Sequence, residues 1–219
     1  MKYANYIDHT LLKANASTQE IKKLCQDALK YEFFSVCVNP CNIKLCQKYL
    51  KNTPVKVCTV IGFPLGANHT KVKLYEAKQA IKDGANEIDI VINIAKLQDK
   101  KYSYVEKELS SLTKICKGRA LVKVIIETCL LTKEEIRKAC EIVYSSGVDY
   151  IKTSTGFSLG GAKVEDIELM SEICKDKVKI KASGGINTLE QMKSLIAAGA
   201  SRIGTSHSVQ IMQEIEKNC

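Results

Sequence analysis

Two short stretches of the chain decide the fold: Asp149-Tyr-Ile-Lys-Thr-Ser-Thr-Gly156 and Val178-Lys-Ile-Lys-Ala-Ser-Gly-Gly185. Each is an apolar run that ends in small residues, which is typical of a buried strand followed by a tight turn. Each also carries a lysine toward the end of the run, Lys152 in the first and Lys181 in the second. Burial disfavours an ammonium group, so two lysines at equivalent positions of neighbouring strands indicate a site where one amine stays neutral beside the charge of the other. A neutral lysine amine is the nucleophile that forms a Schiff base.

Strand and helix patterns alternate along the whole sequence. Besides the two lysine strands, strands are expected at residues 6–12, 33–39, 55–62, 87–93, 120–127 and 201–205. Helices are expected to begin at Ser17, Thr132 and Thr188, each followed three residues later by Glu or Gln as in a capping box, and to cover residues 40–50, 71–83, 102–116, 163–175 and 208–217. Strands that are apolar on both faces indicate a parallel sheet. Eight such units without a linker predict an α/β protein with a single (β/α)8 TIM barrel, one catalytic domain over residues 1–219.

The amino-acid composition argues against a membrane protein, a secreted protein and a metalloprotein. The chain is 45% hydrophobic and 26% charged, and no apolar run approaches the roughly 20 residues of a membrane helix. The start of the sequence lacks a signal-peptide pattern, so we expect a cytoplasmic protein without membrane association. The ten cysteines are scattered and the three histidines show no metal-ligand spacing, so we expect reduced thiols and no metal.

The net charge of +9 comes from 33 Lys and Arg against 24 Asp and Glu. The lysines are dispersed, aromatic residues make up only 6% of the chain and tryptophan is absent, which argues against a nucleic-acid-binding protein. A preference for anionic small molecules is the better interpretation of the charge.

In such a barrel the active site lies where the strands end. Asp89 stands inside an apolar strand, and a carboxylate there is seldom buried unless it is paired. The lysines across the barrel are its expected partners, and Lys123 and Glu127 are expected to share a face of one strand. One interpretation is an ion-pair network that only fills the barrel. The functional one is a pocket with a lysine nucleophile, a second cation and a carboxylate that moves protons.

Small residues follow the last three strands, in Ser154-Thr-Gly156, Ser183-Gly-Gly185 and Gly204-Thr-Ser206. Loops at this place in a barrel often bind phosphate through backbone N–H groups. Each motif alone is a weak signal. Three of them on consecutive strands, next to a lysine pair, favour a phosphorylated substrate.

The chain resembles the 2-deoxyribose-5-phosphate aldolase family of class I aldolases. The resemblance rests on blocks in the expected order, above all Tyr150-Ile-Lys-Thr-Ser-Thr-Gly-Phe157 and Ile180-Lys-Ala-Ser-Gly-Gly-Ile186. It implies that Lys152 forms the Schiff base, that Lys181 keeps the Lys152 amine neutral, and that Asp89 moves protons together with Lys181. The remaining site residues implied are Asp8, Thr10, Cys37, Lys123 and Thr153 around the substrate or the lysine network, and Gly156, Gly184, Gly185, Gly204, Thr205 and Ser206 at the phosphate. The chain departs from many relatives at Asn187, where they carry arginine, and at His207, where they carry a small residue.

The activity expected from the resemblance is reversible cleavage of 2-deoxy-D-ribose 5-phosphate to acetaldehyde and D-glyceraldehyde 3-phosphate, without a cofactor and in a homodimer. Two alternatives remain open: an aldolase that acts on a different phosphorylated aldehyde, and a catalytically silent barrel that binds phosphosugars. A test with several substrates separates the first, and ligand binding without imine formation identifies the second.

Overall fold

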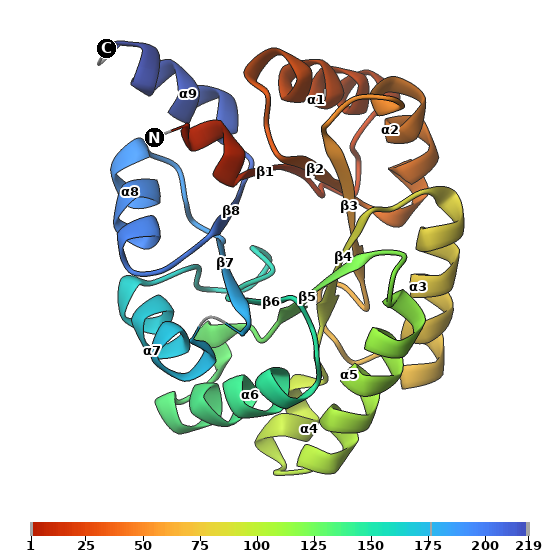
Figure 1. Cartoon of the computed structure of the whole chain (residues 1–219), viewed down its shortest axis with the longest axis vertical. Helices are drawn as coiled ribbons and strands as arrows, with labels where there is room; N and C mark the ends of the chain where they lie inside the picture. The colour runs from red at the N-terminus through yellow and green to blue at the C-terminus, as the bar shows by residue number, and fades with distance from the viewer. Residues whose placement is uncertain (1, 176, 218–219) are drawn as a thin grey trace.

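The computed structural model describes residues 2–175 and 177–217, in which eight strands close into a barrel in their order along the chain. Each strand pairs in parallel with the next, and β8 pairs with β1 to complete the ring. The helices surround the strands on all sides (Figure 1). The predicted (β/α)8 barrel is therefore confirmed.

The strands fall inside the ranges expected from the apolar runs. Their bounds are β1 Ile7–Leu11, β2 Ser35–Val38, β3 Lys56–Ile61, β4 Glu87–Val91, β5 Leu121–Ile125, β6 Tyr150–Lys152, β7 Lys179–Ser183 and β8 Arg202–Thr205. Pairing stops where the chain turns away into the loops, so the polar ends of the apolar runs lie beyond the strands. Lys152 is the last residue of β6, at the border between the barrel and its loops.

The helices follow the pattern of capping signals. Their bounds are α1 Thr18–Tyr31, α2 Ile43–Leu50, α3 Thr70–Asp83, α4 Ile94–Gln98, α5 Tyr102–Cys116, α6 Lys133–Ser145, α7 Val164–Cys174, α8 Leu189–Ala197 and α9 Ser208–Lys217. Within the described residues there are also three short 3-10 turns, η1 Tyr3–Tyr6, η2 Pro40–Asn42 and η3 Thr128–Leu130. Ser17, Thr132 and Thr188 form the three predicted capping boxes. The sequence did not predict α4, a single turn capped by the side chain of Asn93.

The strands have an apolar outer face, and most of them carry charged side chains on the inner face. In β4, for example, Ile88 and Ile90 belong to the main apolar core, whereas Glu87 and Asp89 alternate with them and form ion pairs inside the barrel. This alternation follows from the strand period of two. Buried charges are tolerated only when they are paired, so the barrel interior requires a matched set of acids and bases. Among the described helices, none is long and apolar enough to span a bilayer.

Candidate active site

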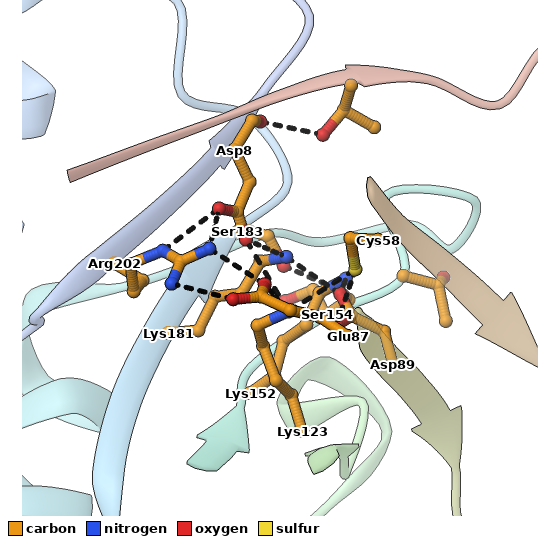
Figure 2. A network of polar contacts seen from close by, with 12 residues as sticks. Asp8, Cys58, Glu87, Asp89, Lys123, Lys152, Ser154, Lys181, Ser183 and Arg202 are labelled. Carbon is orange, nitrogen blue, oxygen red and sulfur yellow. Dashed lines mark hydrogen bonds and ion pairs between the residues drawn. The ribbon is translucent and has the colours of Figure 1, made fainter. Parts of the chain in front are cut away.

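Three side chains meet at the end of the barrel interior: Lys152, Lys181 and Asp89 (Figure 2). The Nζ atoms of both lysines donate hydrogen bonds of 2.7 Å to the same oxygen, Asp89 Oδ2. Both amines reach one oxygen because Lys152 and Lys181 are directly paired in the register of β6 and β7. Lys152 keeps 3% of its surface exposed, while Lys181 and Asp89 keep none.

A second group of charges lies directly against this trio. Lys123 Nζ donates a 2.9 Å hydrogen bond to Asp89 Oδ1 and lies 2.6 Å from Glu87 Oε2. Lys181 Nζ lies 2.6 Å from Asp8 Oδ2, so this lysine is held between two carboxylates. The lysine trio is thus part of a larger buried network.

Arg202 completes the network from β8. Its Nε donates a 2.9 Å hydrogen bond to Asp8 Oδ1, and its Nη2 donates one of 2.9 Å to Glu87 Oε2. Figure 2 shows this guanidinium group between the two carboxylates. The planar fork of arginine suits a bridge between two acids. Within the described residues, the network contains four basic side chains and three acidic ones, listed as Lys123, Lys152, Lys181, Arg202, Asp8, Glu87 and Asp89.

The network fixes the protonation of its members. Burial alone would raise the pKa of Asp89, but the charges of Lys123, Lys152 and Lys181 hold it well below its ordinary value. Burial alone would lower the pKa of Lys181, but Asp8 and Asp89 outweigh it and hold that pKa above its ordinary value. Asp89 is therefore an anion and Lys181 a cation at neutral pH.

Two thiols adjoin Asp89. Cys58 Sγ lies 3.2 Å from Asp89 Oδ1 as a donor and 3.3 Å from Lys123 Nζ as an acceptor, and Cys37 pairs with Cys58 in the register of β2 and β3. In the part of the chain that the structure describes, Cys37, Cys58 and Asp89 form the one set of three potential metal ligands. Three lysine amines already contact this carboxylate, and their positive charges oppose the binding of another cation. The arrangement suits amine chemistry better than metal chemistry.

A cavity of about 210 Å³ opens above Lys152. Its walls come from the loops after β1, β6, β7 and β8, so the substrate-sized space lies on the side of the barrel where small residues follow the strands. The candidate residues that line it are Thr10, Lys152, Gly156, Gly184, Gly185, Gly204, Thr205 and Ser206. Of the lysine pair, Lys152 is the member that reaches the cavity.

Glycines let the loops of β6 and β7 approach closely. A Cβ atom on Gly161 would lie 2.2 Å from the carbonyl oxygen of Gly184, and one on Gly184 would lie 3.1 Å from the Cα of Gly161. Gly184 also has a φ of 84°, which disfavours any other residue. This contact shapes the wall of the cavity. Gly161 did not emerge from the sequence, because a single glycine in a loop carries little signal.

Hydrogen bonds fix the segment that follows Lys152. Thr153 Oγ1 donates to Ser183 O and accepts from Ser183 N, both at 3.1 Å, which ties β6 to β7. The carboxylate of Glu127 accepts from the N–H and the hydroxyl of Thr155. Glu127 adopts a left-handed φ of 55°, so it leaves β5 and turns toward the next loop. It does not share a face with Lys123, contrary to the expectation from strand periodicity.

The structure separates the remaining candidates into three places. Lys123 and Asp8 lie in the buried network. Asp8 was expected near the substrate, but it does not line the cavity. Cys37 packs with Leu12, Val60 and Cys58 in a small apolar cluster. Thr153 is buried and engaged with β7.

Two members of the network were not singled out from the sequence, Glu87 and Arg202. Glu87 stands two residues before Asp89 and therefore shares its face, a signal that strand periodicity provides. Arg202 begins β8 and pairs with Lys181 in the register, which no local pattern reveals.

The fold and the site together define a (β/α)8 barrel with a lysine-centred candidate active site. A model of the DeoC/LacD family of aldolases matches residues 2–213. The chain is 56% identical over 213 residues to the deoxyribose-phosphate aldolase of Finegoldia magna, covering 97% of this chain and 100% of that protein. The corresponding enzyme of Clostridium novyi is 54% identical over 213 residues, with 97% and 96% covered.

Two solved structures agree with this assignment. The deoxyribose phosphate aldolase of Aeropyrum pernix, described as a tetramer, has a TM-score of 0.92 and 30% identity, and the match covers 99% of this chain and 92% of that one. The aldolase QR15 has a TM-score of 0.93 and 45% identity, with 97% and 95% covered. The chain belongs to the DeoC/LacD family of aldolases.

Proposed function

We propose that the chain is a class I aldolase that reversibly cleaves 2-deoxy-D-ribose 5-phosphate to acetaldehyde and D-glyceraldehyde 3-phosphate, with Lys152 as the Schiff-base lysine. The observation that carries the proposal is the position of Lys152, which touches both the buried network and the cavity. The relatives' activity and the geometry of the amines support the same conclusion.

The charge count of the network explains how one amine becomes a nucleophile. Three ionised carboxylates balance three of the four basic groups, so the buried network is neutral when one amine has lost its proton. Lys181 and Arg202 each contact two carboxylates, and Lys123 lies within 4 Å of three. Lys152 contacts a single carboxylate oxygen. Lys152 is therefore the amine with the fewest carboxylate partners, and it is the one that lines the cavity.

The reaction then follows from the contacts. The neutral Lys152 amine attacks the aldehyde carbon of the open-chain sugar, and loss of water gives a protonated imine. Asp89, directly or through a water molecule, accepts the proton of the 3-hydroxyl while the C2–C3 bond breaks and the electron pair enters the imine. Glyceraldehyde 3-phosphate leaves, and Lys181 with Asp89 returns a proton to the enamine. Hydrolysis of the imine releases acetaldehyde and restores Lys152.

The loops of β6, β7 and β8 provide the phosphate site in this proposal. Gly156, Gly184, Gly185 and the segment Gly204–Ser206 line the cavity. Thr10 lines the cavity from β1. Backbone N–H groups in such turns suit the oxygens of a phosphate monoester.

We further propose that the chain works as a single catalytic domain in the cytoplasm and assembles as a homodimer. The nine cysteines of the described residues are free thiols, which suits a reducing compartment. Sedimentation analysis checks the assembly, for which a tetramer is the competing result, given the Aeropyrum pernix relative.

The test of the function is a substrate comparison with the purified protein. Release of acetaldehyde is followed with 2-deoxyribose 5-phosphate and with other phosphorylated aldoses and ketoses of three to six carbons. The proposal predicts that 2-deoxyribose 5-phosphate has the highest kcat/KM. A higher kcat/KM for another phosphorylated sugar would assign the barrel to a different aldolase reaction. Binding of 2-deoxyribose 5-phosphate without turnover of any sugar would identify a silent barrel.

A further inference from the structure

The cavity above Lys152 has a one-sided charge. Its ionisable side chains are Lys13, Lys152 and His207, and no carboxylate lines it among the residues that the structure describes. Lys152 lies at the base, where the proposed chemistry takes place. That leaves Lys13 and His207 as the two basic side chains with no role so far.

Both residues stand on neighbouring parts of the rim. Lys13 follows β1 and His207 follows β8, and these two strands pair directly. Lys152 ends β6, and β7 separates this strand from β8 around the ring. The nucleophile and the two basic side chains thus line the cavity from different strand ends, as a substrate with an aldehyde at one end and an anion at the other requires.

The backbone at each position is held in place. Asn39 Nδ2 donates a 3.1 Å hydrogen bond to Leu12 O and a 3.5 Å hydrogen bond to Lys13 O. The N–H of His207 donates to Thr205 Oγ1 at 2.9 Å, immediately before α9 begins. The His207 ring nitrogen Nδ1 lies 3.2 Å from the hydroxyl oxygen of its neighbour Ser206. The other ring nitrogen, Nε2, has no hydrogen-bond partner within residues 2–175 and 177–217.

We propose that Lys13 and His207 are the specificity-determining side chains that select a phosphate monoester over a neutral end group of the substrate. The inference rests on the proposed function and adds to it the two side chains that bind the phosphate group. Backbone N–H groups and the start of α9 attract any anion weakly. A lysine ammonium and an imidazole N–H, at the ends of the paired strands β1 and β8, add charge-assisted hydrogen bonds to that anion. Neither side chain contacts Lys152, Lys181 or Asp89 within residues 2–175 and 177–217, so both act on substrate binding and not on bond cleavage.

The test compares two substrates in three variants and in the unmodified protein. Cleavage of 2-deoxyribose 5-phosphate and of unphosphorylated 2-deoxyribose is measured for Lys13→Gln, His207→Gln, the double variant and the unmodified protein. Each single substitution should raise KM for the phosphorylated sugar roughly three- to tenfold, the range of one partly exposed ionic contact, with kcat retained. The double variant should raise it roughly ten- to a hundredfold. For unphosphorylated 2-deoxyribose, kcat/KM should stay within about twofold in every variant.

Matched controls carry the same chemical change away from the cavity. Lys51→Gln and His69→Gln replace an exposed lysine and an exposed histidine that do not line it, and both should leave the two substrates unaffected. His207→Arg, which supplies a permanent cation, should lower KM for the phosphorylated sugar.

The outcomes separate the inference from the proposed function. Unchanged KM for the phosphorylated sugar in the double variant would overturn the inference. An equal loss for both sugars would also overturn it, because it would show that the side chains support the loops and do not read the anion. Absence of cleavage of either sugar by the unmodified protein would instead overturn the proposed function.

Discussion

Replacement of Arg202 by methionine tests whether the charge count of the buried network controls the nucleophile. Arg202 contacts neither the cavity nor Lys152, but it supplies one of the four positive charges and bridges Asp8 and Glu87. Without it, three amines face three carboxylates, and the network is neutral only when Lys152 is protonated. Arg202→Met should therefore move the rising limb of the pH profile of kcat/KM to higher pH, by about one pH unit for ~1.4 kcal/mol of altered interaction.

The same substitution has a stability cost that can be estimated. It leaves two buried carboxylates without their shared partner, and the loss of one partner from a buried ion pair costs about 3–5 kcal/mol. For a chain of this length, 1 kcal/mol corresponds to roughly 2–4 °C, so the Tm should fall by about 6–20 °C. Arg202→Lys is the matched control, because it keeps the charge and loses only the fork. It should reduce the Tm, while the rising limb of the pH profile of kcat/KM should stay at the same pH.

Glu87→Gln should shift the pH profile of kcat/KM in the opposite direction. It removes one negative charge that contacts Lys123 and Arg202, so the network retains a surplus of positive charge that favours a neutral Lys152. The rising limb of the pH profile of kcat/KM should therefore move to lower pH. The assay is release of acetaldehyde from 2-deoxyribose 5-phosphate at pH values from about 5 to 10, with circular dichroism to verify folding. Folded Arg202→Met and Glu87→Gln proteins with the unmodified pH profile would refute the charge-balance account.

Three further predictions concern stability and the cavity wall. Burial lowers the pKa of His9 to about 4, so between pH 4 and about 6.5 the unfolded chain binds a proton at His9 and the folded chain does not. The folded state therefore keeps its full stability above pH 6.5 and loses this part of it as the pH falls toward 4. Urea unfolding should show ~2 kcal/mol less stability at pH 5 than at pH 7 from this group, and an equally steep change in His9→Gln would contradict it. Lys73 and Glu108 form a fully buried ion pair at 2.7 Å. Lys73→Met should therefore lower the free energy of unfolding in urea by about 3–5 kcal/mol, and adding Glu108→Leu should restore most of that loss. No recovery in the double variant would count against the pair. Gly161→Ala should press a methyl group against Gly184 O and raise KM for the phosphorylated sugar at least about tenfold, while acetaldehyde still forms an imine; an unchanged KM would show that the loop adapts.

Much of the barrel follows from local patterns in the sequence. The capping boxes at Ser17, Thr132 and Thr188 start helices where predicted, because side chain and backbone satisfy each other within four residues. The apolar runs predict the strands because parallel strands are buried on both faces. The helix α4 was missed because Ile94–Gln98 is too short to show a helical period.

The site was predictable in part, and for reasons that differ by residue. Lys152, Lys181 and Asp89 stand out because charges within apolar strands require partners, and the structure brings all three within hydrogen-bond distance. Arg202 pairs with Lys181 across β7 and β8, and that register depends on the closed barrel. Glu127 leaves its strand through a left-handed residue, which the period of two does not indicate.

The measurement that tests the central claim most directly is borohydride trapping with 2-deoxyribose 5-phosphate, followed by peptide mapping with mass spectrometry. The account predicts a two-carbon adduct on Lys152 and none on Lys181 or Lys123, because Lys152 alone of the three lines the cavity. Lys152→Arg should form no adduct while remaining folded. An adduct on Lys181, or full turnover in a folded Lys152→Ala protein, would contradict the assignment of Lys152 as the nucleophile.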